Sequence, residues 1–583
     1  MFLARLAVGG GPGCPKRPPR QSAVEPVHTV VEIASRGKLV VGEPYFVPGT
    51  PIVLDRKALR GASRGDLAVV ASGRGRAKVE RVLGPAARIE SVLEGVLVER
   101  GARQEFEPVD PPPSGSASRV DLRDLPTFTI DPDTAKDFDD AISVRREGDG
   151  VRVWVHVADV SHYVTPGTPV DRGAARRAFS TYVPGLVAPM LAPELSDDLC
   201  SLRPDVDRLA VTVEFAPGGA KPLFYRSVIR SNARLTYGQA QRREIPADLL
   251  DDLELAAAYS ADLRRRRFAR GALRVVRPEL EFQFDGDGGV ADATWQGEPE
   301  AHALVEELMI VANEAVADLL SSRRREALYR VHERPDPGAV ELLLAKLAEL
   351  GVPTPPAPEN LTPATAADVA AQASELVTRY VERSGRGAEA FPALVLRSLK
   401  QARYDPRNLG HMGLASTAYC HFTSPIRRFS DVICHRALMR EIGQGDDPLP
   451  ENLEDLAEHV SAREREIAEI EYAADDICLA WLLERVLLER GWEEPFEGEI
   501  TGVISSGLFV RFGDVFEGFL PARRMPGDYF ELSTLGTALA GRRGGGVFRL
   551  GDPISVRVEE IRRWEGKVEL TMIRPSGKSG KEP

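Results

Sequence analysis

The sequence predicts a multidomain protein of the α+β class, and three observations lead to that prediction. The chain has 583 residues, a length typical of roughly three or four domains. Strand-like runs separated by Gly and Pro fill its first part, strand-like and then long helical segments follow, and strand-like runs return near the end. The predicted parts are a disordered lead (1–27), a small module (28–110), a linker (111–119), the largest domain (120–490) and a β-rich tail (495–575).

The composition is that of an ordinary folded protein. The chain is 43% hydrophobic and 28% charged, which excludes wholesale disorder. Its net charge of −12 argues against a protein that coats nucleic acid indiscriminately, because such proteins are basic. An enzyme that acts on polynucleotides is not excluded, since the electrostatic field that matters to it is local.

The sequence favours a cytoplasmic location. Its five cysteines include no C-x-x-C pair, so we expect neither disulfides nor a zinc framework, and a reducing compartment fits. The N-terminal F-L-A-R-L-A-V is a poor signal peptide, and no apolar run is long enough to span a bilayer.

The small first module combines strands with one helix. Residues 28–83 alternate runs such as T-V-V-E-I and K-L-V-V with Gly/Pro turns, and a helical pattern then continues to Gly101. The module is therefore either a cold-shock-like barrel or a winged helix with its helix at the end. The Pro/Gly-rich segments on either side have the composition of a disordered lead and of a linker.

The largest domain is predicted to hold strands early and helices late. Residues 151–160 form a predicted strand, residues 301–321 and 460–488 are helical by their period, and residues 353–366 are rich in loop formers. An α+β domain results.

The most informative segment of this domain is I-D-P-D-T-A-K-D-F-D-D-A, residues 130–141. Carboxylates held this close repel one another, and their pKa values rise unless a cation neutralises them. Oxygen ligands at this density, with no Cys or His among them, suit Mg²⁺ or Mn²⁺. The flanking residues 127–130 and 141–144 alternate as strands do, so a metal site between two strands is favoured over a solvated turn.

This acidic run resembles the catalytic loop of the ribonuclease II and ribonuclease R family, whose shared catalytic unit is called the RNB domain. A second block, G-H-M-G-L-A-S-T-A-Y-C-H-F-T-S-P-I-R-R-F-S-D-V-I-C-H-R at residues 410–436, resembles the family as closely. A third match is H-V-A-D-V-S-H-Y-V at residues 156–164, followed by F-S-T-Y-V-P-G at residues 179–185. The resemblance covers residues 120–480.

The resemblance implies that four aspartates of the loop hold a catalytic Mg²⁺, for which Mn²⁺ could substitute, and that Asp133 is a bystander. Asp139 is expected to be catalytic as well, because it would orient the ion or the attacking water. Divalent ions can activate the water and stabilise the charge that develops on phosphate and leaving group. The four predicted ligands are Asp131, Asp137, Asp139 and Asp140.

The resemblance also implies contacts with RNA. Arg427 is the predicted catalytic phosphate clamp, because its planar guanidinium can hold two phosphate oxygens, and a structural salt bridge is the alternative. Arg428 either contacts RNA or pairs with Asp431. Tyr182 stands where the family has an aromatic that stacks on a terminal base, whereas V-H-E-R-P-D-P at residues 331–337 offers no second stacking aromatic. Two further RNA-binding candidates are Arg234, for which packing is the alternative, and His435.

The tail resembles an S1-type RNA-binding domain, which is a five-stranded OB barrel. The resemblance rests on P-F-E-G-E-I-T-G-V-I-S-S-G-L-F-V-R-F, E-G-F-L-P and L-G-D-P-I-S-V-R-V-E-E-I. Bases stack on exposed aromatics of such barrels. Phe509, Phe512 and Phe519 are the nominated aromatics, and each has core packing as its alternative. Residues 541–546 are expected to be a loop between strands.

Together these resemblances predict a Mg²⁺-dependent, processive, hydrolytic 3′→5′ exoribonuclease that degrades single-stranded RNA to nucleoside 5′-monophosphates. Degradation of structured RNA with a 3′ overhang is left open. The alternatives are an RNA-binding protein that has lost catalysis and a metal-dependent endonuclease on the same fold. The expected partner is the 3′ end of single-stranded RNA, with no membrane, no obligate protein partner and a monomeric state. The family usually carries two cold-shock domains before the RNB domain, and there is room here for one.

Overall fold

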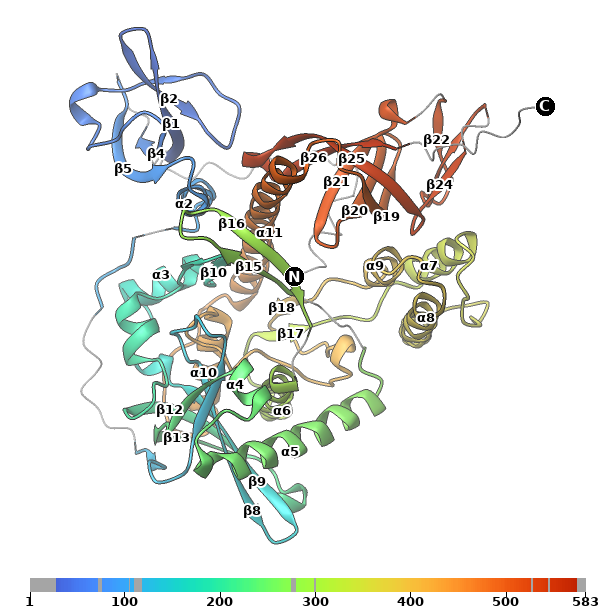
Figure 1. Ribbon diagram of the computed structural model, residues 1–583. Helices are drawn as coiled ribbons and strands as arrows, with labels where there is room; N and C mark the ends of the chain where they lie inside the picture. The colour runs from blue at the N-terminus through green and yellow to red at the C-terminus, as the bar shows by residue number, and fades with distance from the viewer. Residues whose placement is uncertain are drawn as a thin grey trace.

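The computed structural model describes residues 28–71, 76–103, 105–109, 118–273, 279–297, 300–525, 528–543 and 546–573. The predicted disordered lead and most of the predicted linker lie outside the described residues. In Figure 1 the N-terminal module lies at upper left, the large domain below it and the β-rich tail at upper right. The long helix α11 (Leu453–Arg490) runs from the large domain up to the tail.

The N-terminal module is an antiparallel sheet of order β3-β2-β1-β4-β5 followed by one α-helix in its described part. A parallel bridge between Leu54 and Ala77 joins the sheet's two outer edges. Helix α2 confirms the predicted helix but ends at Glu99, two residues before Gly101, and its buried face packs against α11. The elements are β1 (His28–Arg36), β2 (Leu39–Pro44), β3 (Ile52–Val53), β4 (Asp66–Ala71), β5 (Lys78–Pro85) and α2 (Ile89–Glu99).

The large domain is built on a seven-stranded sheet of order β14-β7-β8-β9-β12-β13-β6. Both faces of this sheet are buried: helices α5 and α6 cover one, while α3, α10 and the start of α11 pack near the other. The predicted strands around the acidic run and at residues 151–160 are confirmed as β7, β8 and β9. The strands are β6 (Val120–Asp121), β7 (Phe128–Asp131), β8 (Asp140–Glu147), β9 (Gly150–Ala158), β12 (Asp207–Phe215), β13 (Leu223–Arg230) and β14 (Ala233–Thr236).

A row of buried polar side chains crosses this sheet and fixes the pairing of its strands. The Thr127 hydroxyl lies 2.7 Å from that of Ser143, which is 3.1 Å from Nε2 of His156. On the other side, Nδ1 of His156 lies 2.9 Å from the Thr212 hydroxyl, which is 2.7 Å from that of Ser227. Burial lowers the pKa of His156 to about 3, so its imidazole is neutral and can both donate and accept in this row.

The helices predicted from period are confirmed, with shifted ends. The helix predicted at residues 301–321 is α6, and the one predicted at 460–488 is α11, which begins earlier because the Asn452 side chain caps it. The predicted loop over 353–366 ends sooner than expected, since Thr362 caps α8. The helices are α3 (Pro169–Arg177), α4 (Tyr237–Arg242), α5 (Leu250–Ala269), α6 (Glu300–Ser322), α7 (Pro337–Glu349), α8 (Pro363–Ser384), α9 (Ala390–Arg397) and α10 (Phe429–Glu441).

Among its described residues the large domain also has three two-stranded sheets, two of which matter here. Hairpin β10–β11 carries Tyr182, and hairpin β15–β16 packs along α11. Their bounds are β10 (Thr181–Val183), β11 (Leu186–Ala188), β15 (Glu279–Phe284), β16 (Val290–Gln296), β17 (Tyr329–Val331) and β18 (Arg403–Asp405).

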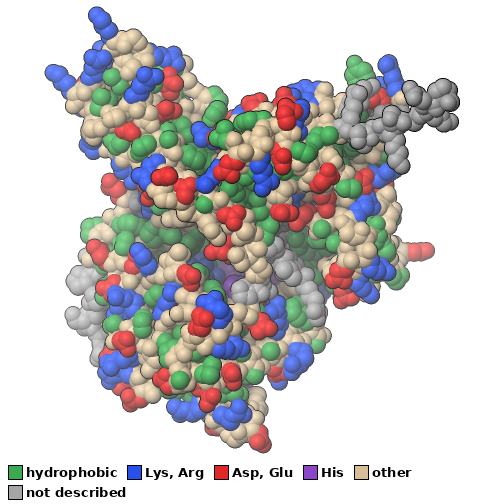
Figure 2. Space-filling view, in the orientation of Figure 1, with side chains coloured by type: hydrophobic (Ala, Val, Ile, Leu, Met, Phe, Trp, Pro, Cys, Tyr) green, Lys and Arg blue, Asp and Glu red, His purple; other side chains and the backbone are tan. Residues whose placement is uncertain are grey.

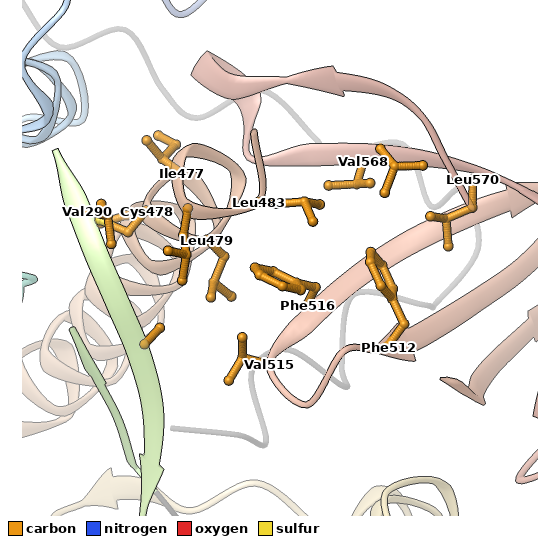
Figure 3. Close-up of a cluster of buried hydrophobic side chains, with 14 of the residues drawn as sticks. Val290, Ile477, Cys478, Leu479, Leu483, Phe512, Val515, Phe516, Val568 and Leu570 are labelled. Atoms are coloured by element: carbon orange, nitrogen blue, oxygen red, sulfur yellow. The ribbon is translucent and has the colours of Figure 1, made fainter. Parts of the chain in front are cut away.

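The tail is a closed barrel of order β19-β20-β21-β26-β25. Around the ring, its first, second, third, fifth and fourth strands follow one another, and the N-terminal sheet has the same succession because the Leu54–Ala77 bridge joins its outer edges. Figure 3 shows Leu479 and Leu483 of α11 pointing at Phe516 of the barrel, within one continuous core. A small sheet is inserted before β25, and the predicted loop at 541–546 connects two of its strands, with residues 544–545 outside the described range. The strands are β19 (Phe496–Ile504), β20 (Gly507–Phe512), β21 (Phe516–Pro521), β22 (Phe530–Leu532), β23 (Ala538–Gly541), β24 (Val547–Arg549), β25 (Pro553–Arg562) and β26 (Lys567–Met572).

The four cysteines within the described residues are free, buried thiols. Among the helices of the described part, none combines the length and apolar character needed to cross a membrane.

The buried imidazole predicts a specific dependence of stability on pH. His156 has a folded pKa of about 3 and an unfolded pKa of about 6.5, so the unfolded chain takes up the proton first as pH falls. Between pH 7 and pH 5 this group should lower the free energy of unfolding by about 2 kcal/mol. In the His156→Gln variant, the free energy of unfolding is expected to fall by about 2 kcal/mol less between pH 7 and pH 5 than in the unaltered protein. Urea unfolding at both pH values measures this. Equal losses in the two proteins would contradict a neutral buried His156.

Candidate active site

The acidic loop connects two neighbouring strands of the central sheet. Asp131 is the last residue of β7 and Asp140 the first of β8, so both are held by the sheet, while Asp137 and Asp139 lie in the loop between them. Asp139 is 3% exposed, and its Oδ1 accepts a hydrogen bond of 2.8 Å from the Ile426 N–H. This bond joins the loop directly to residues 424–428, the arginine block, which contains Arg427 and Arg428.

Burial and crowding together perturb the carboxylates. Burial, together with the charge of a neighbouring aspartate in each case, raises the pKa of Asp131 to about 6 and that of Asp140 to about 7. Burial also raises the pKa of Asp139 well above its ordinary value, against the opposing effect of Arg427. Oδ2 of Asp131 and Oδ2 of Asp139 are buried without a hydrogen-bond partner. Each therefore has an oxygen that a cation could satisfy.

The donor set fits a hard divalent cation, although the side chains are not yet gathered around one point. All four candidates are carboxylates, which Mg²⁺ and Mn²⁺ prefer. Over the described residues, no three His, Cys, Asp or Glu side chains converge as a metal-binding group. Protein partners hold two of the candidates instead: Asp137 Oδ2 accepts from the Tyr182 hydroxyl at 2.9 Å, and Asp139 Oδ2 lies 3.3 Å from Arg427 Nε. Cation binding would replace these contacts.

The arginine block has one accessible guanidinium, that of Arg427, and one that is ion-paired within the protein, that of Arg428. The Arg427 side chain is 45% exposed, and besides the contact with Asp139 it donates to the Ser424 hydroxyl at 3.0 Å. Arg428 donates twice to Asp431, at 3.0 and 2.7 Å. Asp431 is fully buried and also accepts from the Ser424 N–H. Arg428 therefore takes the alternative of pairing with Asp431, whereas Arg427 is free to turn toward a phosphate.

Tyr182 reaches the same place from a third segment of the chain. Its side chain lies next to the loop through the contact with Asp137, and the residue is 38% exposed. The segment before it pairs with the arginine block, since the Ser180 N–H donates to the Arg427 carbonyl at 3.0 Å. The loop, the tyrosine and the arginine thus converge, although they lie far apart in the sequence.

Two predicted RNA contacts are wrong in this structure. His435 is completely buried, its Nε2 lies 2.9 Å from the Phe422 carbonyl and its ring stacks on Phe422, so it has no surface to offer. Phe512 is 1% exposed and lies in the barrel core, because it shares the inward side of β20 with Leu508 and Val510.

Of the other three candidates, Phe509 and Phe519 reach the surface of the barrel, whereas Arg234 is occupied within the protein. Phe509 is 38% exposed and pairs across the strands with the half-buried Phe519, their ring centroids 5.1 Å apart. Arg234 is occupied by the acidic loop: it donates to the carbonyls of Pro132 and Asp133, and its guanidinium lies over the Phe138 ring. Packing rather than RNA is therefore the role that the structure gives Arg234.

Two residues near the site were missed from the sequence. Tyr237 opens α4, directly after the residue that pairs with Asp131, and its pKa is raised by burial and then by Asp140 and Asp131. Recognising A-R-L-T as a strand beside β7 would have placed it there. Glu471 lies buried on α11, accepts from the Tyr182 N–H at 2.9 Å, and has its pKa raised by burial to about 7. The helical period of α11 gives no signal that Glu471 lies beside the site.

Family comparison decides the identity of this arrangement. The RNB domain matches residues 119–443, more than half of the chain, and the S1 RNA binding domain matches residues 493–573. The chain belongs to the ribonuclease II and ribonuclease R family. The predicted fold class, an RNB domain followed by an S1-type barrel, is thereby confirmed.

Two relatives within this family show the extent of the match. Ribonuclease R of Escherichia coli (strain K12) is 37% identical over 507 residues, which cover 81% of this chain and 60% of that protein. Ribonuclease R of Aquifex aeolicus (strain VF5) is 37% identical over 489 residues, which cover 80% of this chain and 67% of the relative. The chain thus spans about 60% of the length of the Escherichia coli relative.

Solved structures agree on the fold. Mycoplasma genitalium RNase R in complex with ribose methylated single-stranded RNA matches with a TM-score of 0.81 and 25% identity, over 94% of this chain and 90% of that one. Yeast Ssd1, described as a pseudonuclease, matches with a TM-score of 0.63 and 16% identity, over 90% of this chain and 68% of that one. The fold of this family therefore does not by itself establish hydrolysis.

The two neighbouring arginines should differ sharply in their effect on stability. Arg428→Met leaves the buried Asp431 without its cation, so we expect the free energy of unfolding to fall by about 3 kcal/mol. Arg427→Met removes a half-exposed side chain and should change it by less than about 1 kcal/mol. Urea unfolding of both variants measures this. Comparable losses would contradict the structural role of Arg428.

Proposed function

We propose that this protein is a Mg²⁺-dependent, processive exoribonuclease of the cytoplasm, active as a monomer on the 3′ end of single-stranded RNA. It would hydrolyse one phosphodiester bond at a time and release nucleoside 5′-monophosphates. The observation that carries the proposal is a set of buried and half-buried carboxylates, two of which have an oxygen without a hydrogen bond, facing an accessible arginine and tyrosine. Family membership supports the same reaction class.

Each residue of the site has a task in this reaction. Asp131, Asp137, Asp139 and Asp140 would hold the cation, whose chemistry is to polarise the phosphate and lower the pKa of an attacking water. Arg427 would move from Asp139 to the non-bridging phosphate oxygens, because both are anionic oxygens within reach of the same guanidinium. Tyr182 would release Asp137 and present its ring to the terminal base.

The two small modules would bind RNA by different physical means. On the C-terminal barrel, the outward pair Phe509 and Phe519 offers a stacking surface that is indifferent to base sequence. In the described part of the N-terminal module, Tyr45 and Phe46 pack against a core, and the Phe106 ring is covered by the Arg177 guanidinium. Its contribution to RNA binding must then come from charge.

That charge is available because several cations of the N-terminal module are exposed and form no ion pair within its described part. Within the described residues, Lys38, Lys57, Arg64 and Lys78 are exposed and have no carboxylate partner. In contrast, Glu94 is held by Arg81 and Arg103, and Glu99 accepts from the Val30 N–H. Figure 2 shows Lys and Arg side chains projecting from the upper-left module. These cations would contact RNA phosphates.

The decisive test of function is removal of one predicted metal ligand. Asp139→Asn should lower turnover by on the order of 10³-fold, because metal assistance contributes several kcal/mol to the transition state. RNA affinity should change little. Asp133→Asn is the matched control, since Asp133 is an exposed residue of the same loop that we assign no role. The assay follows RNA labelled at either end in the presence of Mg²⁺.

The products separate the proposal from its rivals. Mononucleotides released from the 3′ end, without internal fragments, support exonucleolytic hydrolysis. Internal fragments would instead indicate an endonuclease, and RNA binding without cleavage by the unaltered protein would indicate a pseudonuclease. A hairpin with and without a 3′ overhang shows whether structured RNA is also degraded.

The two binding modes should respond differently to salt. Phe509→Ala removes a stacking ring, so it should weaken RNA binding by about 1–3 kcal/mol at every ionic strength. The double variant Lys38→Ser/Lys57→Ser removes two phosphate contacts and should reduce the slope of log affinity against log salt by about 1.4. Filter binding of single-stranded RNA over a range of KCl concentrations measures both. An unchanged slope in the lysine variant would exclude the electrostatic role of the N-terminal module.

A further inference from the structure

The acidic loop depends on distant segments for its shape. Between β7 and β8 it leaves the sheet, and within it one backbone hydrogen bond joins the Ala135 N–H to the Pro132 carbonyl at 3.1 Å. Its last residues, Phe138 and Asp139, are buried, and backbone groups that are withdrawn from water need partners from other segments. At its start Arg234 provides partners, and at its end the Ala158 N–H donates to the Asp139 carbonyl at 2.9 Å.

The middle of the loop, between two predicted metal ligands, is held by Ser201. The Ser201 hydroxyl donates to the Lys136 carbonyl at 2.7 Å and accepts from the Phe138 N–H at 3.1 Å. The next residue continues the contact, since the Leu202 N–H donates to the Phe138 carbonyl at 2.9 Å. Peptide groups on both sides of Asp137, and on both sides of Phe138, are thereby fixed.

Ser201 is itself rigidly placed. It is completely buried, and the neighbouring Cys200 and Leu202 side chains belong to the core of the large domain. Its carbonyl accepts from the Arg208 side chain at 2.9 Å and from the Arg203 N–H at 2.8 Å. A hydroxyl in this position can transmit the rigidity of the core to the loop, because it donates and accepts at the same time.

We propose that Ser201 is a positioning residue for cation binding: its hydroxyl sets the spacing and direction of Asp137 and Asp139. This inference rests on the proposed function, since it concerns the same carboxylates. With the backbone already fixed, cation binding requires only side-chain rotation. Without the hydroxyl, the loop must be ordered at the moment of binding, and the affinity for the ion falls accordingly.

The variants isolate the hydroxyl. Ser201→Ala removes both hydrogen bonds with little change in volume, and Ser201→Thr restores a hydroxyl. Ser196→Ala is the matched control: Ser196 is also buried and lies five residues earlier on the same segment, but its hydroxyl donates to Asp197 and not to the loop. If Ser201→Ala fails to fold, Ser201→Cys provides a variant of similar size with a weak donor and acceptor.

The readouts include two that do not depend on activity. Hydrogen exchange of the metal-free protein should speed up at the loop amides, the Phe138 N–H above all, by about tenfold or more in Ser201→Ala. Mn²⁺ binding without RNA, followed by electron paramagnetic resonance, should weaken by about 10–100-fold. Turnover should fall at low Mg²⁺ and recover at high Mg²⁺, with RNA affinity unchanged. Ser201→Thr should restore part of the Mn²⁺ affinity.

The outcomes distinguish this inference from the proposed function. If Ser201→Ala binds Mn²⁺ as the unaltered protein does, or if Ser196→Ala weakens binding equally, the positioning role is wrong while the exonuclease assignment stands. If the unaltered protein neither binds Mn²⁺ nor hydrolyses RNA, the proposed function itself fails.

Discussion

The site depends on the burial of one carboxylate, that of Asp139. Its backbone carbonyl is held by Ala158, its Oδ1 by the Ile426 N–H, and its Oδ2 faces Arg427. Three segments that are remote in sequence are therefore joined through a single residue. A carboxylate removed from water in this way strongly favours a compensating positive charge. Arg427 supplies part of that charge in the structure, and a divalent ion would supply more.

In the proposed reaction, cation binding and substrate binding would depend on each other. The contacts that occupy Asp137 and Asp139 come from Tyr182 and Arg427, the two groups proposed to receive the RNA end. An ion that takes over the carboxylates would release both groups for the substrate. Before the ion binds, Tyr182 and Arg427 would therefore be less available to RNA than afterwards.

Local patterns in the sequence were enough to predict most helices and strands. A resemblance to a known family was needed to predict that the acidic loop, Tyr182 and Arg427 meet at one site. The acidic run between two alternating strands was predicted correctly because both signals are local. Phe512 could have been assigned to the core from its parity with Leu508 and Val510 on one strand. His435 could not, because α10 is buried on nearly every side and its hydrophobic period is weak. Tyr237 could have been placed had A-R-L-T been recognised as a strand beside β7, whereas Ser201 reaches the loop through a tertiary contact that no pattern along the chain records.

The shared core of α11 and the C-terminal barrel has a consequence for dissecting the protein. Sequence patterns place a boundary between residues 490 and 495, yet apolar side chains of α11 fill the space against Phe512 and Phe516 (Figure 3). Helix α2 packs on the same helix from the N-terminal module. Cutting the chain at that boundary would expose a hydrophobic surface on each fragment and promote aggregation. The N-terminal module, the large domain and the barrel therefore share a hydrophobic core and are not independent domains.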